Sequence, residues 1–382
     1  MKYYIIAGEA SGDLHGANLI KELKQMDPIA EIHCWGGDKM KEAGATLIKH
    51  YRELAFMGFV EVVKNLRTIF RNLAFCKADI LYYKPDTLIL IDYPGFNLRV
   101  AAWAKKQGIN VIYYISPQVW AWKENRVKGI RKNVDKMLVI LPFEKEFYKK
   151  WDFDVEYVGH PLVRVIDDFI NEQREREQMG NLAPFIEDNS LPIIALLPGS
   201  RKQEILKKLP IMLQVAEKFP SYHFVVAKAP GIENSFYDEL MAPYKNVSAV
   251  INKTYQLLWH CKAALVTSGT ATLETALFAV PQVVCYKGNA VSFQIAKIMI
   301  TIKYICLVNL IMNKEVVKEL IQNDLTAENI TLELNRILSD AEKQAQLNRD
   351  YNALRNLLSM GGDASFNAAK IICNFLNHKK HA

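Results

Sequence analysis

The feature that most constrains the fold of this chain is a regular alternation between short apolar runs and helical patterns. In the first half, six such runs are separated by segments with helical spacing, for example residues 14–26. The runs are KYYIIAG (2–8), EIHCWGG (31–37), DTLILID (86–92), NVIYYIS (110–116), KMLVILP (136–142) and VEYVGHP (155–161). Strand-length runs that alternate with helices are typical of βαβ units, so we expect a parallel sheet.

The alternation stops at a polar, charged segment near residues 166–190 and then begins again. Five further runs follow: PIIALLPGS (192–200), YHFVVAKAP (222–230), NVSAVIN (246–252), AALVTSG (263–269) and PQVVCYK (281–287). A chain of 382 residues is too long for one ordinary core. We therefore predict an α/β chain with two similar doubly wound domains, 1–165 and 191–345, joined by a linker at 166–190. A helical tail, 346–382, is expected to pack back on the first domain or on a partner subunit.

Composition excludes several classes of protein. The net charge of +7 is mild and suits a protein that meets anions, but no basic-aromatic array indicates nucleic-acid binding. Six scattered cysteines favour a reduced, cytoplasmic protein, and the eight histidines form no metal-binding pair, so we expect no metal. The longest apolar segment, 290–312, is interrupted by polar residues, and the first apolar run is too short for a signal peptide.

An acidic residue ends the most apolar run of the first domain. Four large aliphatic residues, Leu88–Ile91, read as a strand buried on both faces, and Asp92 follows at its carboxyl end. Ligands of open parallel sheets bind beyond that end, and two such sheets would face each other across a cleft. Asp92 is therefore either a catalytic group in the cleft or an N-cap for a helix starting near Asn97.

The loop AGEASGDLHG (7–16) joins the first expected strand to the first expected helix. Its glycines would let a ligand approach backbone N–H groups at the helix N-terminus. The alternative is a tight turn in which Ser11 or Asp13 caps the helix. Glu9 and His15 could act as acid or base, or they could be hydrogen-bonded loop residues.

The second domain opens with LLPGSRKQEI (196–205), a strand, a turn and a helix. The amides of Gly199 and Ser200 and the guanidinium of Arg201 could bind a phosphate, since an arginine fork matches phosphate oxygens bidentately. The alternative is an N-capping Ser200 beside an exposed arginine.

A second turn of this kind occurs in LVTSGTATLETALF (265–278). Ser268, Gly269 and Thr270 lie where an apolar run becomes a helix, which suits a diphosphate at the positive end of that helix. Glu274 lies about one turn further and could bind a ribose. It could also be a solvated helix acid or form a capping arrangement with Thr270.

Three other features have more than one interpretation each. Trp120 and Trp122 could stack on a sugar or pack inside the protein, and His160 at a strand end could be catalytic or structural.

The segment 59–75 has helical spacing of apolar and basic residues, which suits an anionic membrane surface, an acyl chain, or simple packing on the first sheet. The residues with this pattern are Phe59, Val62, Val63, Leu66, Ile69, Phe70 and Leu73, with Lys64, Arg67 and Arg71 on another face. A second apolar-basic stretch occurs at 295–305.

Five motifs, in this order and spacing, resemble the lipid A disaccharide synthase family. They are GEASGD (8–13), DYPGFN (92–97), SPQVWAW (116–122), LLPGSR (196–201) and SGTATLE (268–274). The resemblance covers essentially the whole chain. It implies a GT-B glycosyltransferase with two Rossmann-like domains, no cofactor and no metal in the site. Such enzymes transfer 2,3-diacylglucosamine, with inversion, from its UDP carrier to the 6-hydroxyl of 2,3-diacylglucosamine 1-phosphate, at the cytoplasmic face of the inner membrane. A homodimer is one further expectation.

The resemblance also implies roles for individual residues. Asp92 would be the general base, with Glu9 and His15 as further catalytic candidates. The nucleotide would be held by Gly199, Ser200, Arg201, Ser268, Gly269, Thr270, Glu274 and Asn309. Sugar or acceptor contacts would come from Gly8, Ser11, Gly12, Asn97, Trp120 and Trp122.

This sequence departs from some relatives at three positions. Tyr93 and Gly95 flank the acid, which would reshape an acceptor pocket, and Lys287 stands where an arginine can occur. Two other functions stay open at this point. One is a UDP-N-acetylglucosamine 2-epimerase-like enzyme, and the other is a non-catalytic, membrane-associated module that binds sugar nucleotides.

Overall fold

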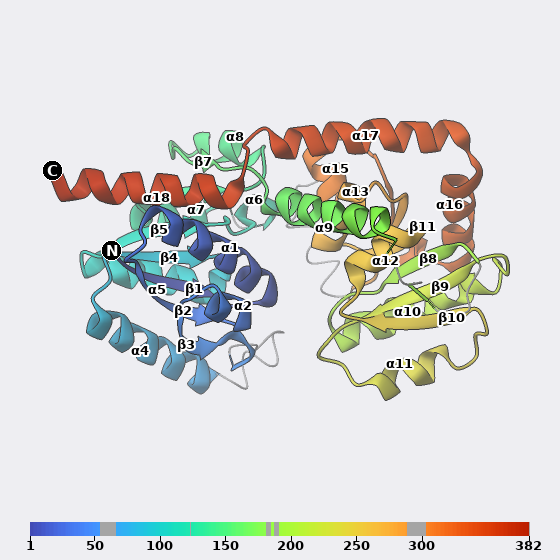
Figure 1. Cartoon of the computed structure of the whole chain (residues 1–382), viewed down its shortest axis with the longest axis horizontal. Coiled ribbons are helices and arrows are strands. Elements are labelled where there is room, and N and C mark those ends of the chain that lie inside the picture. Colours follow the sequence, from blue (N-terminus) through green and yellow to red (C-terminus); the bar gives the residue numbers. More distant parts are fainter. Residues whose placement is uncertain (54–65, 123, 181–184, 187–190, 289–302, 382) are drawn as a thin grey trace. The chain divides into compact units, whose positions relative to one another are not determined.

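A computed structural model gives the architecture of the chain (Figure 1). It describes residues 1–381 except 54–65, 123, 181–184, 187–190 and 289–302. The chain forms two compact units: the first is Met1–Pro161 with Leu358–Ala382, and the second is Leu162–Leu357. The segment expected to be a linker therefore begins inside a helix, α9 (Pro161–Gln178), and the final residues return to the first unit.

The first unit contains a seven-stranded sheet whose strands all run parallel, in the order β3-β2-β1-β4-β5-β6-β7. The strands are β1 (Lys2–Ala7), β2 (Glu31–Gly36), β3 (Thr46–His50), β4 (Thr87–Ile91), β5 (Asn110–Tyr114), β6 (Lys136–Val139) and β7 (Glu156–Tyr157). The helices are α1 (Ala10–Met26), α2 (Asp38–Glu42), α4 (Leu66–Tyr83), α5 (Pro94–Lys106), α6 (Val119–Trp122), α7 (Arg126–Asn133), α8 (Glu144–Lys149) and α18 (Ala364–His381), with a 3-10 turn at Tyr51–Glu53.

The last helix, α18, belongs to the core of the first unit. Its apolar side chains, including Ala368, Ile372 and Leu376, form one buried cluster with Leu19 and Leu23 of α1 and with the inner residues of the sheet. Burying large aliphatic side chains is worth about 1.5–3 kcal/mol each, so this contact accounts for the return of the chain to the first sheet.

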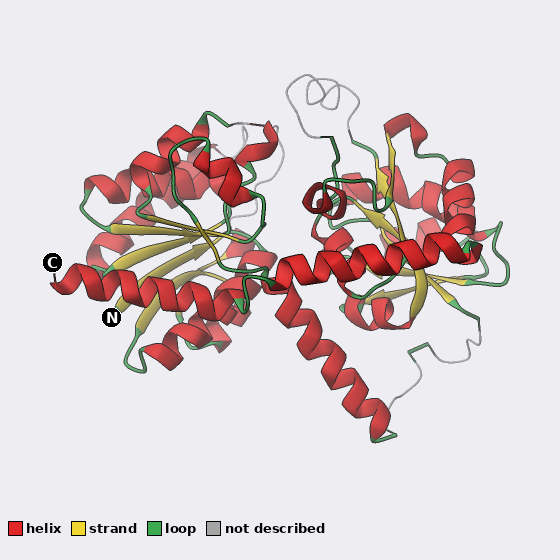
Figure 2. Ribbon diagram, turned by 90° about the horizontal axis from the view of Figure 1, so that it is seen from above, coloured by secondary structure: helices red, strands yellow, loops and turns green. Residues whose placement is uncertain are grey.

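The second unit contains a six-stranded parallel sheet in the order β10-β9-β8-β11-β12-β13. Its strands are β8 (Ile193–Leu197), β9 (His223–Lys228), β10 (Val247–Ile251), β11 (Cys261–Thr267), β12 (Gln282–Tyr286) and β13 (Lys318–Ile321). Its helices are α9, α10 (Lys202–Ala216), α11 (Asn234–Met241), α12 (Thr254–His260), α13 (Thr270–Leu277), α15 (Leu307–Met312), α16 (Ala327–Ser339) and α17 (Ala341–Ser359), with a 3-10 turn at Gln322–Asp324. In both units, helices cover both faces of the sheet (Figure 2).

The predicted doubly wound α/β architecture is confirmed, with two strands that the sequence analysis did not identify. Each of them, β3 and β13, forms an edge of its sheet and is at most partly buried along most of its length. An edge strand has a solvent-facing side, so its sequence lacks the continuous apolar run of the central strands.

Candidate active site

Both units have a topological switch point, and Asp92, Glu9 and the residues of the two predicted phosphate-binding turns lie there. In the first sheet the order of strands reverses between β1 and β4, and in the second between β8 and β11. The pairs are in register up to their carboxyl ends, with Ala7 opposite Ile91 and Leu197 opposite Val266. The crevice beyond such a point is where ligands of doubly wound sheets bind.

Asp92 follows β4 in a tight, unusual turn of the backbone. Asp92 and Tyr93 both have left-handed conformations, with φ of 43° and 50°, and α5 begins at Pro94. Side chains from neighbouring elements hold this turn: the Asn97 amide lies 2.8 Å from the Asp92 carbonyl oxygen, and the Tyr113 hydroxyl donates to the same oxygen at 2.5 Å. Left-handed conformations at such residues cost energy and tend to occur at functional sites.

The Asp92 carboxyl is half-buried beside a second acid. Burial, and secondarily the nearby Glu9 carboxylate, raise its pKa to about 7. The N-cap position of α5 belongs to Tyr93, so the alternative in which Asp92 caps a helix starting near Asn97 is wrong. A carboxyl that titrates near pH 7 is well matched to general base catalysis.

The loop after β1 brings Glu9 to the same switch point. Glu9 occupies the N-cap position of α1, and its side chain makes no capping hydrogen bond. Asp13 does not cap its own helix. Its carboxylate accepts hydrogen bonds from the backbone of Gly37 at 2.6 Å and Met40 at 3.1 Å, so it caps α2. Ser11 is exposed at the first turn of α1.

Two histidines are buried in this region of the first unit. Burial lowers the pKa of His15 to about 4, and burial together with the nearby His15 lowers the pKa of His160 to about 3. Both imidazoles are therefore neutral at pH 7. The Nδ1 atom of His15 is buried and lacks a hydrogen-bond partner among the described residues.

The glycines of this loop make room for protein side chains. A Cβ atom at Gly8 would lie 2.3 Å from Cγ of Tyr93, and one at Gly12 would lie 3.1 Å from the Cβ of Ala7. Asn97, predicted as a sugar contact, is fully buried and donates to backbone carbonyls at the ends of β1 and β4. At Gly8 and Gly12, the space that a Cβ atom would fill is therefore occupied by protein atoms.

Trp120 is also buried, with its ring edge-on to Phe143 at a centroid distance of 5.0 Å. Of the two interpretations given for Trp120 above, the structure shows packing inside the protein. The side chain of Trp122 lies outside the described residues.

In the second unit, the switch point contains a cleft of about 480 Å³. Seven of the eight residues predicted to hold a nucleotide line it: Gly199, Ser200, Arg201, Ser268, Gly269, Thr270 and Glu274. The sequence analysis did not identify the other lining residues, which are Leu197, Glu204, Ala227, Lys228, Ala229, Pro230, Thr254, Thr267 and Ala271. Leu197, Glu204, Thr267 and Ala271 belong to the two quoted turn segments but received no role there, and the remaining residues come from stretches without a recognisable motif.

The two turns in this cleft depend on glycine. Gly199 has φ of +115° and Gly269 has φ of +149°, conformations that favour glycine. The N-cap positions of α10 and α13 belong to Arg201 and Gly269, and neither helix has a side-chain cap. The alternatives in which Ser200 caps α10, or Thr270 and Glu274 form a capping arrangement, are therefore wrong.

Glu274 lies one turn inside α13, where Tyr255 donates a hydrogen bond to its Oε1 atom at 3.0 Å. Burial raises the pKa of this carboxyl, and the Tyr255 hydrogen bond acts in the opposite direction. Because the Tyr255 hydroxyl bonds to Oε1, the second carboxylate oxygen of Glu274 can accept a hydrogen bond from a hydroxyl of a ligand.

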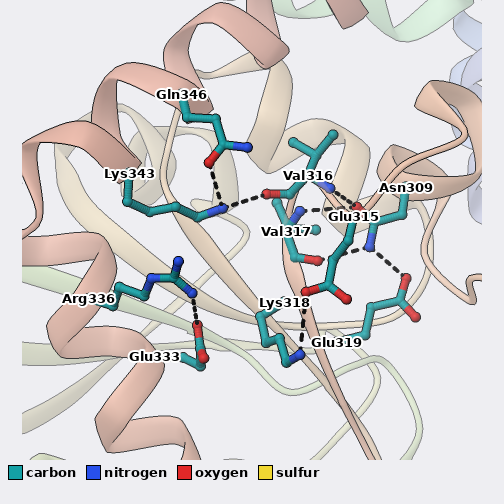
Figure 3. Close-up of polar contacts among 10 residues, drawn as sticks. All are labelled: Asn309, Glu315, Val316, Val317, Lys318, Glu319, Glu333, Arg336, Lys343 and Gln346. Carbon is teal, nitrogen blue, oxygen red and sulfur yellow. Dashed lines mark hydrogen bonds and ion pairs between the residues drawn. The ribbon is translucent and has the colours of Figure 1, made fainter.

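Asn309, the eighth predicted nucleotide residue, lies outside the lining of this cleft. Its fully buried amide donates to Val317 and Glu319 and accepts from the backbone of Val316 and Val317 (Figure 3). Glu319 in turn accepts from the backbone of Ile305. Because the Ser268 hydroxyl donates to the Ile305 carbonyl at 2.9 Å, Asn309 supports the Ser268 turn indirectly.

The membrane residues predicted from the segment 59–75 are only partly described. Phe59, Val62 and Val63 lie outside the described residues, as does the side chain of Leu66. In α4, Arg67 and Arg71 are exposed, Phe70 is 61% exposed and Ile69 is partly buried. Among the described helices, none is long and apolar enough to cross a membrane.

Within the described part of the chain, no group of three or more His, Cys, Asp or Glu side chains is arranged to hold a metal ion.

The sequence places the chain in a known family. Residues 3–370 match the lipid-A-disaccharide synthetase family. The chain belongs to this family. Lipid-A-disaccharide synthase of Geobacter metallireducens is 38% identical over 381 residues, which cover 98% of this chain and 97% of that protein. The same enzyme of Coxiella burnetii is 36% identical over 376 residues, covering 97% and 98%. The family predicted from the motifs is confirmed.

Solved structures confirm the fold of this synthetase family member. The UDP-GlcNAc 2-epimerase of Neisseria meningitidis bound to UDP-GlcNAc superposes with a TM-score of 0.68 at 15% identity, over 99% of this chain and 100% of that one. The glycosyltransferase of kitacinnamycin gives 0.66 at 14% identity, over 98% and 99%. At these identities the likeness concerns the GT-B fold alone, so it does not favour the epimerase alternative.

Proposed function

We propose that this chain transfers 2,3-diacylglucosamine from UDP-2,3-diacylglucosamine to the 6-hydroxyl of 2,3-diacylglucosamine 1-phosphate. The products are the β(1→6)-linked disaccharide 1-phosphate and UDP. The observation that carries this proposal is the sequence match to lipid-A-disaccharide synthases over nearly the full length of both chains. The two switch-point sites support it, because one is a cleft lined by Arg201 and by the turn at the N-terminus of α13, and the other has a carboxyl of suitable pKa.

In the proposed reaction, Asp92 is the general base. It accepts the proton of the acceptor 6-hydroxyl while that oxygen attacks C1 of the donor sugar, on the side opposite UDP. The C1–oxygen bond to the diphosphate breaks, and its electron pair leaves with UDP. The half-buried carboxyl, with its pKa raised to about 7, supports this role. Glu9 contributes by raising that pKa.

The diphosphate is proposed to bind at the two turns of the second unit. The exposed Arg201 guanidinium and the backbone amides at the N-terminus of α13 would stabilise the negative charge that UDP gains as it leaves. Glu274, held by Tyr255, would accept a hydrogen bond from the ribose.

We further propose that α4 contacts the anionic cytoplasmic face of the inner membrane, where the lipid substrates reside. The exposed Phe70, flanked by exposed Arg67 and Arg71 on the same helix, supports this surface. Apolar side chains surrounded by basic ones are typical of such peripheral contacts. A homodimer remains a prediction.

The test is to incubate the purified chain with the two acylated substrates, with a chelator present, and to measure UDP and disaccharide together. Equal amounts of both products, with a β anomeric configuration by NMR, are expected. UDP-N-acetylglucosamine serves as the comparison substrate. Its conversion to the 2-epimer would favour an epimerase, and UDP binding without any turnover would favour a non-catalytic module.

A further inference from the structure

A buried lysine lies beneath the two turns of the nucleotide cleft. Lys208, on α10, is only 3% exposed, although lysine is rarely buried without charged or hydrogen-bonded partners. It is not among the residues that line the cleft, and the proposed reaction gives it no role.

The partners of Lys208 lie next to the two turns, at the end of β11 and on α10. Its ammonium donates a hydrogen bond to the hydroxyl of Thr267, the last residue of β11, which directly precedes the turn at Ser268. The same ammonium lies 3.8 Å from Oε2 of Glu204. The other carboxylate oxygen of Glu204 accepts from the Arg201 guanidinium at 3.2 Å.

The lysine is also close to the first turn itself. A Cβ atom at Gly199 would lie 3.5 Å from Nζ of Lys208 and 3.1 Å from Oε2 of Glu204. Hydrogen bonds and ion pairs therefore connect Arg201, Glu204, Lys208 and Thr267 in sequence, from one turn to the other.

A gain in folding stability does not by itself explain why Lys208 is buried with these partners. Removing a lysine from water is costly, and a buried ion pair is often no more stabilising than apolar side chains of the same volume. Burial lowers the pKa of the ammonium, while Glu204 and the Cys285 thiol act in the opposite direction and Arg201 adds to the lowering. In a poorly solvated position, a charge and its hydrogen bonds act strongly on nearby groups.

We propose that Lys208 is a positioning residue for diphosphate binding: through Thr267 and Glu204 it holds the two turns of the cleft in the arrangement that a diphosphate requires. This role rests on the proposed function, because it assumes that UDP binds in this cleft. It predicts that losing the ammonium affects the diphosphate part of the ligand and spares the nucleoside part.

The experiment compares the affinities of the full-length chain for UDP and for uridine by titration calorimetry. In Lys208→Met the apolar stem remains but the charge is lost. Because the ammonium would no longer hold the two turns in place, UDP should bind roughly tenfold more weakly or worse, with the uridine affinity unchanged. Lys207→Met, an exposed lysine on the same helix, is the matched control and should leave both affinities unchanged.

The outcomes separate this role from general stabilisation. Equal losses of UDP and uridine affinity in Lys208→Met would overturn the proposal, as would an unchanged UDP affinity. If Lys208→Met does not fold, Thr267→Val removes the acceptor of the same hydrogen bond and gives the same comparison. If the wild-type chain fails to bind UDP, the proposed function falls and the role of Lys208 falls with it.

Discussion

The pH dependence of turnover tests the assignment of Asp92 most directly. A general base acts only when it is deprotonated, so activity should fall as pH falls through its pKa. Burial and Glu9 raise the pKa of Asp92 to about 7. We therefore expect kcat/KM to be constant well above that pH and to fall tenfold per pH unit well below it. At pH 6, only about one tenth of the carboxyls would be ionised, and kcat/KM should be about one tenth of its plateau.

The variant Glu9→Gln tests whether the Glu9 carboxylate helps to raise the pKa of Asp92. It removes a negative charge that raises the pKa of Asp92, so the acidic limb should move to lower pH, and activity at pH 6 should rise relative to the plateau. Glu42→Gln, an exposed acid at the end of α2, makes the same change in net charge and should leave the limb in place.

The assay is the initial rate of UDP and disaccharide formation from the two acylated substrates between pH 5 and 9. Asp92→Asn should lower the high-pH plateau of kcat/KM by about a hundredfold or more and remove its fall at low pH, because a positioned base contributes roughly 10²–10⁴-fold. UDP affinity should be retained. Near-normal turnover in Asp92→Asn would refute the assignment. Glu9 or His15 would then be the candidate base. If His15 is the base, the fall of kcat/KM at low pH should be centred near pH 4.

Three further predictions concern binding, packing and the membrane. Glu274→Gln should lower the affinities for UDP and for uridine by the same factor, about tenfold, because both ligands contain the ribose. A loss of UDP affinity alone would contradict the proposed ribose contact. Gly8→Ala should lower the free energy of unfolding by about 1–3 kcal/mol in urea, because its Cβ would overlap the Tyr93 ring, whereas Gly95→Ala, with open space around it, should cost much less. Phe70→Ser should reduce co-sedimentation with anionic vesicles and leave the affinity for UDP unchanged; undiminished sedimentation would argue against α4 as the contact.

Much of the fold and part of the candidate site could be predicted from the sequence. The central strands are buried on both faces, so each appears as a continuous apolar run, and the residue that ends each run lies at the carboxyl edge of a sheet. This is why Asp92, Arg201 and Ser268 could be identified without coordinates. The edge strands β3 and β13 were missed because one side of each faces solvent.

Local patterns did not reveal which polar groups meet in space. In the alternative interpretation of the first loop, Ser11 or Asp13 caps its own helix, but Asp13 caps α2, whose amides come from residues 24 to 27 positions away. Asn97 and Trp120 looked like ligand contacts, and the fold buries both. The partners of Asp13 and Trp120 are distant in the chain, and Asn97 contacts the distant Ile6 as well as the nearby Ile91 and Asp92, so sequence spacing does not specify these contacts.

The sequence by itself therefore determined the two doubly wound units, the family, and the turns at the ends of the strands. These follow from the period of apolar residues and from short motifs, which are local properties of the chain. Only the tertiary structure decided that Glu9 lies beside Asp92, that Tyr255 orients Glu274 and that Lys208 connects two turns. Those relations depend on how the strands and helices pack in three dimensions, which brings together residues 19 to 83 positions apart.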